Sequence, residues 1–350
     1  MTGQARVLHV VDRLTGGVPA AVRGYIANSP SRFTHTILSP FVGSAPAAVW
    51  TGVEAEMRDL GSPSIAKSPQ RISVVATEMG ADVVHAHSSF PGLYARTPTG
   101  RRTRPPVVYS PHGFAFERRD VGGAKRIAFR GVEQLLGAST TALAACGRGE
   151  ARTARQIRSL GGRVIFVPNV SAMSVTARPA RADGVFRIGM LGRLTSQKDP
   201  RYFSRVVQTI RDAVGPIEAL WMGSGDSRNL DQEVIVTGWM DQADVAQMLA
   251  GIDLYIHSAA WEGFPLAVLD ANNVGLPILV RRIPAFTDLP DSLTVEQGLL
   301  EMTSSMNRGH FSLWAEANRR GWSEYLQDHT PQNQRRALDS LWGSGGWNFE

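Results

Sequence analysis

The chain alternates between short apolar runs rich in Val, Ile and Leu and longer stretches in which apolar and polar residues are mixed. The short runs have the length of strands, and the stretches between them are long enough for helices. This order is typical of α/β domains with parallel sheets. In the first half the expected strands are residues 6–11, 36–38, 83–85, 107–109, 142–144 and 164–167.

A segment rich in Ser, Ala, Arg and Pro interrupts this cycle at residues 171–184, and such a composition favours a linker between domains. The cycle then starts again, and the length of 350 residues also favours two domains over one. In the second half the expected strands are residues 186–191, 217–222, 234–237, 254–257 and 277–280.

We therefore predict an α/β fold with two Rossmann-like domains that face each other across a cleft. The domains would span residues 1–170 and 185–325, and we expect the tail, residues 326–350, to pack back on the first domain. The single cysteine, Cys146, cannot form an internal disulfide, and neither a secretory leader nor a membrane-spanning apolar run is found. We expect a cytoplasmic location.

The formal charge of +6 is divided unevenly along the chain. Residues 1–170 contain 21 Lys or Arg against 10 Asp or Glu, whereas the remainder contains 16 against 21, so the two parts carry +11 and −5. A basic first domain is either a solvated surface or a surface for an anionic partner. The arginine clusters lack the interleaved aromatic residues typical of nucleic-acid platforms, so we expect no nucleic-acid partner.

The segment WEGFPLAVLDANNVGLP, residues 261–277, directly follows an expected strand. Glu262 would lie at the carboxyl end of that strand, where open α/β sheets bind ligands. Pro265 is typical of a first helical position, and the backbone N–H groups beside it would form an anion site. Asp270 follows Glu262 by eight residues, about 10 to 12 Å at helical rise. That distance is too long for paired acid and base catalysis on one glycosidic bond.

This segment resembles the signature of the retaining glycosyltransferases of family 4, which have the two-Rossmann GT-B fold. Their signature is a Glu, seven further residues and a second Glu, usually within E-G-F-P or E-G-F-G. The chain has Glu262 followed by Gly263, Phe264 and Pro265, but Asp270 replaces the second Glu and is one methylene shorter.

The resemblance implies a role for each of these positions. Glu262 would bind hydroxyls of the transferred sugar, and backbone amides near Phe264 and Leu266 would contact the sugar and the diphosphate. Asp270 would bind the ribose. The first domain would bind the acceptor and the second the nucleotide-sugar donor.

Two further segments resemble the same family. Residues 189–199, GMLGRLTSQKD, are similar to its G-R-L…K segment, in which Arg193 and Lys198 would clamp the diphosphate and stabilise the leaving group. Residues 110–113, SPHG, are similar to its H-G segment, in which His112 would reach the sugar and the reacting centre from the first domain. Loop positions expected to contact the donor are Gly16, Gly17, Gly225, Gly238 and Trp239.

We expect neither a metal nor a cofactor. His85 and His87 could hold a metal only if a third ligand converged on them, and no D-x-D motif occurs. The resemblance implies front-face transfer with retention, in which the leaving diphosphate accepts the proton of the acceptor. The function predicted is transfer of a hexosyl group from a UDP- or GDP-sugar to an acceptor. The acceptor expected is a lipid-linked glycan in bacterial polysaccharide biosynthesis. A nucleotide-sugar 2-epimerase of the same fold and a transferase with a small soluble acceptor are the alternatives.

The basic first domain further suggests peripheral docking on an anionic membrane surface. Arg126 and Arg130 would share a helical face, with Ile127 and Phe129 available for shallow insertion. The basic residues expected at the surface are Arg101, Arg102, Arg104, Arg118, Arg119, Lys125, Arg126 and Arg130.

Overall fold

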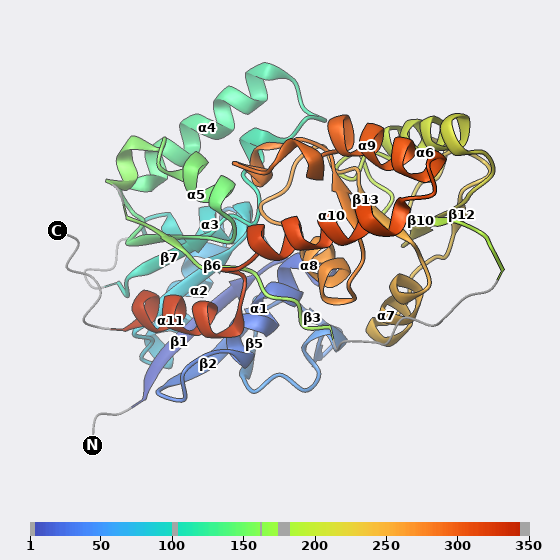
Figure 1. Cartoon of the computed structure of the whole chain (residues 1–350). Helices are drawn as coiled ribbons and strands as arrows, with labels where there is room; N and C mark the ends of the chain where they lie inside the picture. The colour runs from blue at the N-terminus through green and yellow to red at the C-terminus, as the bar shows by residue number, and fades with distance from the viewer. Residues whose placement is uncertain (1–3, 100–103, 162, 174–182, 344–350) are drawn as a thin grey trace. The chain divides into compact units, whose positions relative to one another are not determined.

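The computed structural model describes residues 4–99, 104–161, 163–173 and 183–343. The chain divides into two compact units, the first formed by Met1–Val170 with His329–Glu350 and the second by Ser171–Asp328. Figure 1 shows a parallel sheet with helices in each unit. The predicted α/β class with two Rossmann-like domains is confirmed.

The first unit contains a seven-stranded sheet in the order β5-β2-β1-β6-β7-β8-β9, with all neighbours parallel. The edge strand β5 was not predicted, because its sequence EMRD is charged and only partly buried. The strands are β1 (Ala5–Val11), β2 (Phe33–Ser39), β5 (Glu56–Asp59), β6 (Val83–His87), β7 (Val107–Ser110), β8 (Ala142–Ala145) and β9 (Val164–Phe166). A short hairpin is formed by β3 (Phe41–Val42) and β4 (Ala45–Pro46).

Helices cover both faces of this sheet, because successive residues of a strand point to opposite sides. Leu8 and Val10 of β1 belong to one buried cluster, and Val7 belongs to another. Near the end of the chain, α11 buries Leu338 and Trp342 in the cluster of Val7. The helices are α1 (Gly17–Ala27), α2 (Ser68–Glu78), α3 (Ser89–Arg96), α4 (Gly123–Gly137), α5 (Arg148–Ala154) and α11 (Pro331–Trp342).

The second unit contains a five-stranded parallel sheet in the order β12-β11-β10-β13-β14. Its strands are β10 (Arg187–Leu191), β11 (Glu218–Met222), β12 (Ile235–Val236), β13 (Leu254–His257) and β14 (Ile278–Val280). Its helices are α6 (Pro200–Val214), α7 (Gln242–Ala250), α8 (Leu266–Asn273), α9 (Val295–Asn307) and α10 (Phe311–Tyr325).

Of the predicted linker, the structure describes residues 171–173 and 183–184, whereas residues 174–182 lie outside the described residues. The Ser171 hydroxyl donates to Asp270 Oδ1 at 2.6 Å, and the Met173 carbonyl accepts from Asn273 Nδ2 at 2.7 Å. The beginning of this segment therefore packs on α8 as part of the second unit.

Five of the eight histidines gather inside the first unit, on β1, β2, β6 and the loop after β7. Burial lowers the pKa of every one of them, to about 4 for His35 and His112 and well below the usual 6.5 for His9, His85 and His87. Since an imidazole with so low a pKa carries no charge at neutral pH, this core is polar but uncharged.

These histidines predict that the first unit loses stability in mild acid before the second. A lowered pKa means that the unfolded chain binds protons between pH 6.5 and about 4, whereas the folded unit does not. Each such histidine should remove up to about 3 kcal/mol of the free energy of unfolding across that window. Hydrogen exchange at pH 7.5 and pH 5 should show protection lost in peptides of β1 and β6 while β10 and β13 stay protected. Equal protection of the two sheets at pH 5 would contradict this.

Candidate functional site

Glu262 is placed by the short loop between β13 and α8. Pro265, with φ −76° and ψ 122°, is the residue that precedes the helix, and Leu266 is the first helical residue. The prediction that Pro265 starts the helix was wrong by one position. Glu262 therefore lies in the loop, so helical rise does not set its separation from Asp270. Phe264 is buried and packs edge-on against Phe286, which anchors the loop in the core.

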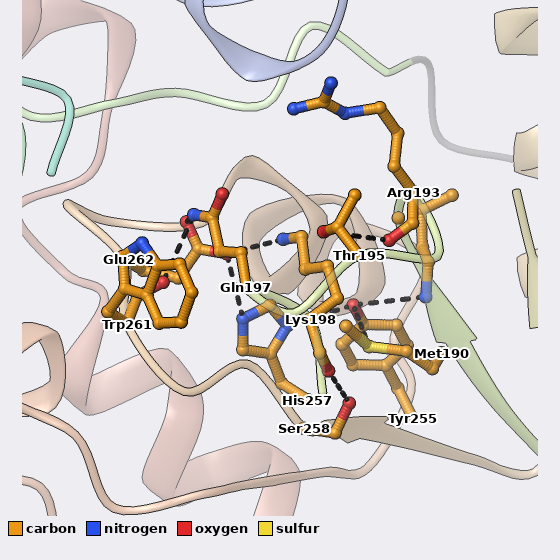
Figure 2. A network of polar contacts seen from close by, with 12 residues as sticks. Met190, Arg193, Thr195, Gln197, Lys198, Tyr255, His257, Ser258, Trp261 and Glu262 are labelled. Atoms are coloured by element: carbon orange, nitrogen blue, oxygen red, sulfur yellow. Dashed lines mark hydrogen bonds and ion pairs between the residues drawn. The ribbon is translucent and has the colours of Figure 1, made fainter. Parts of the chain in front are cut away.

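The Glu262 carboxylate is bound within the second unit by two residues of the loop after β10. Lys198 Nζ lies 2.5 Å from Oε1, and Gln197 Nε2 lies 3.2 Å from Oε2. Figure 2 shows these side chains together. The Lys198 and Glu262 side chains are 17% and 11% exposed, so the pair is largely shielded yet reachable from solvent. Two residues predicted for different parts of the donor thus contact each other directly.

A buried histidine lies beneath this ion pair and was not predicted. His257 Nε2 is 3.8 Å from Glu262 Oε1, and His257 Nδ1 is 3.2 Å from the Tyr255 hydroxyl. Burial first and Lys198 second lower the pKa of His257, so its ring is neutral. Its Nε2 has no hydrogen-bond partner among the described residues. The alternation of Tyr255 and His257 in an otherwise apolar strand is the signal that could have identified it.

Arg193 extends away from the Lys198–Glu262 pair in Figure 2 and is exposed. It makes no ion pair with any described residue, which leaves its guanidinium available to a ligand. Gly225, with φ 143°, lies where the loops after β10 and β11 meet, and a Cβ there would come within 2.4 Å of the Leu194 carbonyl oxygen. Gly238 has φ 79°, and Trp239 beside it is 81% exposed.

Asp270 lies on α8 with its carboxyl bonded to Ser171, as described above. Burial raises the pKa of Asp270 to about 6, and the hydrogen bond from Ser171 opposes that rise. The carboxyl therefore changes its charge close to neutral pH.

In the first unit, His112 occupies the turn after β7 with φ 52°, and Gly113 follows with φ 100°. Left-handed backbone at a non-glycine residue is costly and is often found at functional sites. The turn is held by Glu150, which accepts the Gly113 N–H at 2.6 Å and the Cys146 N–H at 2.8 Å. Glu150 was not predicted, since nothing in the sequence distinguishes it from other acidic residues in the first turn of a helix. Gly16, with φ 85°, directly precedes α1, whose first residue is Gly17.

The structure brings His9 to His85 and His87, with one nitrogen of each ring within 4.8 Å of the others. The third candidate ligand that a metal would need is therefore present. However, both ring nitrogens of all three histidines already take part in hydrogen bonds, to other histidines, to Ser110 or to Trp342. A metal could bind here only by displacing those bonds.

Comparison with known protein families identifies both units. The glycosyl transferase 4-like domain matches residues 5–170, and the glycosyl transferases group 1 domain matches residues 185–303. Both domains belong to glycosyltransferase families. Together the two matches span most of the chain.

A curated relative is the UDP-Gal:alpha-D-GlcNAc-diphosphoundecaprenol alpha-1,3-galactosyltransferase of Escherichia coli, with 28% identity over 229 residues. The aligned stretch covers 58% of this glycosyltransferase and only 58% of that relative's length.

Solved structures show the same architecture. The sucrose-phosphate synthase of Thermosynechococcus elongatus has a TM-score of 0.77 at 11% identity, with 96% of this chain and 97% of that chain covered. Anabaena HepE in complex with UDP and glucose has a TM-score of 0.69 at 13% identity, with 97% and 100% covered. These likenesses establish the GT-B fold, as predicted. Among the helices that the structure describes, none is long and apolar enough to cross a membrane.

Asp270 predicts an unusual pH dependence of the second unit. Because the folded state holds this proton up to about pH 6, whereas the unfolded chain releases it near 3.8, stability falls as the pH rises between these values. Asp270→Asn keeps a neutral side chain and should gain about 1 to 2 kcal/mol relative to wild type between pH 5 and pH 7.5. Urea unfolding at both pH values measures this, and the exposed Asp244→Asn is the control. No gain for Asp270→Asn would show that its pKa is ordinary.

Proposed function

We propose that this glycosyltransferase moves a hexosyl group from a UDP- or GDP-sugar to a lipid-linked glycan, with retention and without a metal. The observation that carries the proposal is the Lys198–Glu262 pair, held at the carboxyl end of β13 directly before α8. The resemblance of Glu262 and its loop to the family 4 signature supports the same assignment.

The pair offers both kinds of group that a nucleotide-sugar needs. Each oxygen of Glu262 uses one lone pair on Lys198 or Gln197 and retains another, which can accept from a sugar hydroxyl. The Lys198 ammonium has two further N–H donors for a phosphate oxygen. The first turn of α8 has no side-chain cap, so its backbone N–H groups can also bind the diphosphate.

The charge that develops on the leaving diphosphate would be stabilised by Lys198, by the amino end of α8 and by Arg193. In the proposed front-face transfer, this diphosphate accepts the proton of the acceptor hydroxyl. Glu262 is paired with an ammonium, which favours a binding role over that of a covalent nucleophile. Asp270 would bind the ribose through Oδ2, because Oδ1 already accepts the Ser171 hydroxyl.

The acceptor and the donor nucleotide are inferred from relatives. The Escherichia coli relative is named for UDP-Gal and a diphosphoundecaprenol acceptor, and HepE was solved with UDP and glucose. Thermal stabilisation by UDP, GDP and their sugars identifies the donor, since a ligand that binds the folded state raises its stability. A 2-epimerase would release free nucleotide or epimer without an acceptor, whereas the proposed enzyme requires the acceptor hydroxyl.

Glu262→Ala is expected to lower turnover strongly, because the hydrogen bond to the transferred sugar is lost in the transition state. The loss in kcat/KM should correspond to about 2 to 4 kcal/mol, with affinity for the free nucleoside diphosphate largely retained. Glu301→Ala, on α9 of the same unit, is the matched control and should behave as wild type. Near-normal kcat/KM for Glu262→Ala would remove Glu262 from the site.

We also propose that α4 docks the enzyme on an anionic membrane at the cytoplasmic face. Its outer side is a continuous apolar stripe in which Ile127 and Leu135 are 75% and 79% exposed. The stripe consists of Ala124, Ile127, Ala128, Gly131, Val132 and Leu135, all exposed and within one helical face. The opposite side is anchored, because Glu133 forms a buried ion pair with Arg96 at 2.8 Å.

The structure changes which residues could take part in docking. Phe129 packs against the core, so its predicted insertion is wrong, whereas Ile127 is available. Arg126 donates to the Phe116 carbonyl at 2.9 Å, and Arg118 pairs with Asp120. Lys125 and Arg130 on α4 are exposed, and so is Arg119 in the segment before this helix. Arg104 donates to the Ala95 carbonyl, and Arg101 and Arg102 lie outside the described residues.

Co-sedimentation with vesicles tests this docking. Binding should require anionic lipid, weaken as salt rises, and decrease for the triple variant Arg119→Gln, Lys125→Gln, Arg130→Gln, since each cation near the surface contributes about 1 kcal/mol. Leu135→Ser should weaken binding independently of salt. The control triple Arg228→Gln, Arg308→Gln, Arg320→Gln removes the same charge from the second unit. Protein that stays in the supernatant at low salt would favour a soluble acceptor.

A further inference from the structure

Four histidines of the first unit form a single row of hydrogen-bonded rings that ends at His112. His112 Nε2 lies 3.1 Å from His87 Nδ1, and His87 Nε2 lies 3.0 Å from His9 Nδ1. His9 Nε2 lies 3.1 Å from His35 Nδ1, and His35 Nε2 lies 2.8 Å from Ser29 Oγ. Four imidazoles thus connect the turn after β7 with a half-buried serine on the far side of β1.

A neutral imidazole has one N–H and one bare nitrogen, so it donates at one end and accepts at the other. In an unbranched row of neutral rings, every hydrogen bond must therefore point the same way. Burial keeps these rings neutral, as described above. Only two arrangements are possible, one with every donor directed towards Ser29 and one with every donor directed towards His112.

Ser29 decides between them. Its hydroxyl oxygen lies 3.1 Å from the Pro30 carbonyl oxygen, which can only accept, and a hydroxyl proton donated there leaves the Ser29 oxygen as an acceptor. Ser29 must then accept from His35, and His35 must carry its proton on Nε2. The bare Nδ1 of His35 then accepts from His9 Nε2–H, and the same relation holds between each later pair of rings. His9, His87 and His112 therefore all carry the proton on Nε2.

A fifth ring reaches the same form independently. Trp342 Nε1, which can only donate, lies 3.3 Å from His85 Nδ1, so His85 carries its proton on Nε2 and donates to Ser110 at 2.9 Å. The Nε2–H tautomer therefore satisfies every hydrogen bond described above for these five histidines.

We infer that the row holds His112 as its Nε2–H tautomer, so that its Nδ1 is a bare acceptor ready for a substrate hydroxyl. His112 is only part-buried, and its Nδ1 has no hydrogen-bond partner among the residues that the structure describes. His87, His9 and His35 are positioning residues, because each acts on His112 only through its neighbour. The hydroxyl recognised would belong to a bound substrate, a step that rests on the proposed function.

Nuclear magnetic resonance of the full chain with ¹⁵N-labelled histidine tests the tautomer without substrate, because protonated and bare ring nitrogens have widely separated shifts. His112 signals are assigned by comparison with His112→Gln. Wild type should show a bare Nδ1 and a protonated Nε2. Ser29→Ala removes the hydroxyl that sets the direction of hydrogen-bond donation along the row. The His112 signals should therefore move towards those of a mixture of its two tautomers, although three rings separate the two residues. Ser29→Thr retains the hydroxyl and should restore the wild-type spectrum. Ser31→Ala, an exposed serine two residues away, should leave it unchanged.

A protonated Nδ1 on His112 in wild type, or an unchanged His112 spectrum in folded Ser29→Ala, would overturn the inference. A metal among His9, His85 and His87 would also overturn it, and added zinc would then perturb these three rings selectively. If the two tautomers become equally populated, kcat/KM of Ser29→Ala should fall about two-fold, because half of the molecules present the acceptor. The spectrum does not depend on transfer, so an inactive protein with the expected tautomer would contradict the proposed function and still support this inference.

Discussion

Parallel pairing of the strands is the constraint on which both units depend. Since neighbouring strands run the same way, the loops that follow them emerge at one edge of each sheet. In the second unit this gathers the loops after β10, β11 and β13, which carry Lys198, Gly225 and Glu262. In the first unit it places the turns after β1 and β7, with Gly16 and His112, at one edge. The candidate residues lie at strand ends because only there does the backbone leave the buried sheet.

Such edges place polar groups in poorly solvated surroundings, and the two units satisfy those groups differently. The second unit pairs opposite charges, with Glu262 beside Lys198 at the amino end of α8. The first unit avoids charge on its histidines, whose rings satisfy one another as neutral donors and acceptors. A buried charge without a partner would cost several kcal/mol, which both arrangements prevent. The candidate donor site of the second unit thereby retains fixed charges that can bind a diphosphate. The histidine row of the first unit retains a single direction of hydrogen-bond donation.

The helix α4 of the first unit shows that apolar residues on one helix can lie either in the core or at the surface. The helix around Arg126 was predicted correctly, but the apolar residues on it divide into two sets. Phe129 faces the core, whereas Ile127 and Leu135 face solvent, because 3.6 residues per turn place them on different sides. The core of the domain, and not the helix alone, determines which side is covered.

Short apolar runs and their spacing determined the α/β class, the two Rossmann-like domains and nearly all central strands, because burial on both faces demands apolar residues locally. The E-G-F-P run likewise located Glu262 at a strand end. The sequence did not reveal β5, whose charged residues can occupy an edge strand since only one neighbour pairs with it.

Only the tertiary structure decided which residues pair with one another in the candidate site and in the histidine row. Lys198 and Glu262 are 64 residues apart, and His9 and His87 are 78 apart, so only the folding of separate strands brings them within hydrogen-bond distance. The alternation of His85 and His87 was visible in the sequence, but the residues that complete their hydrogen bonds come from β1, β7, the turn after β7 and α11. The local pattern of apolar residues determines which side of each segment is buried. Which residues of two distant segments meet depends on the order and register of the strands, and these are not determined by the sequence of any single segment.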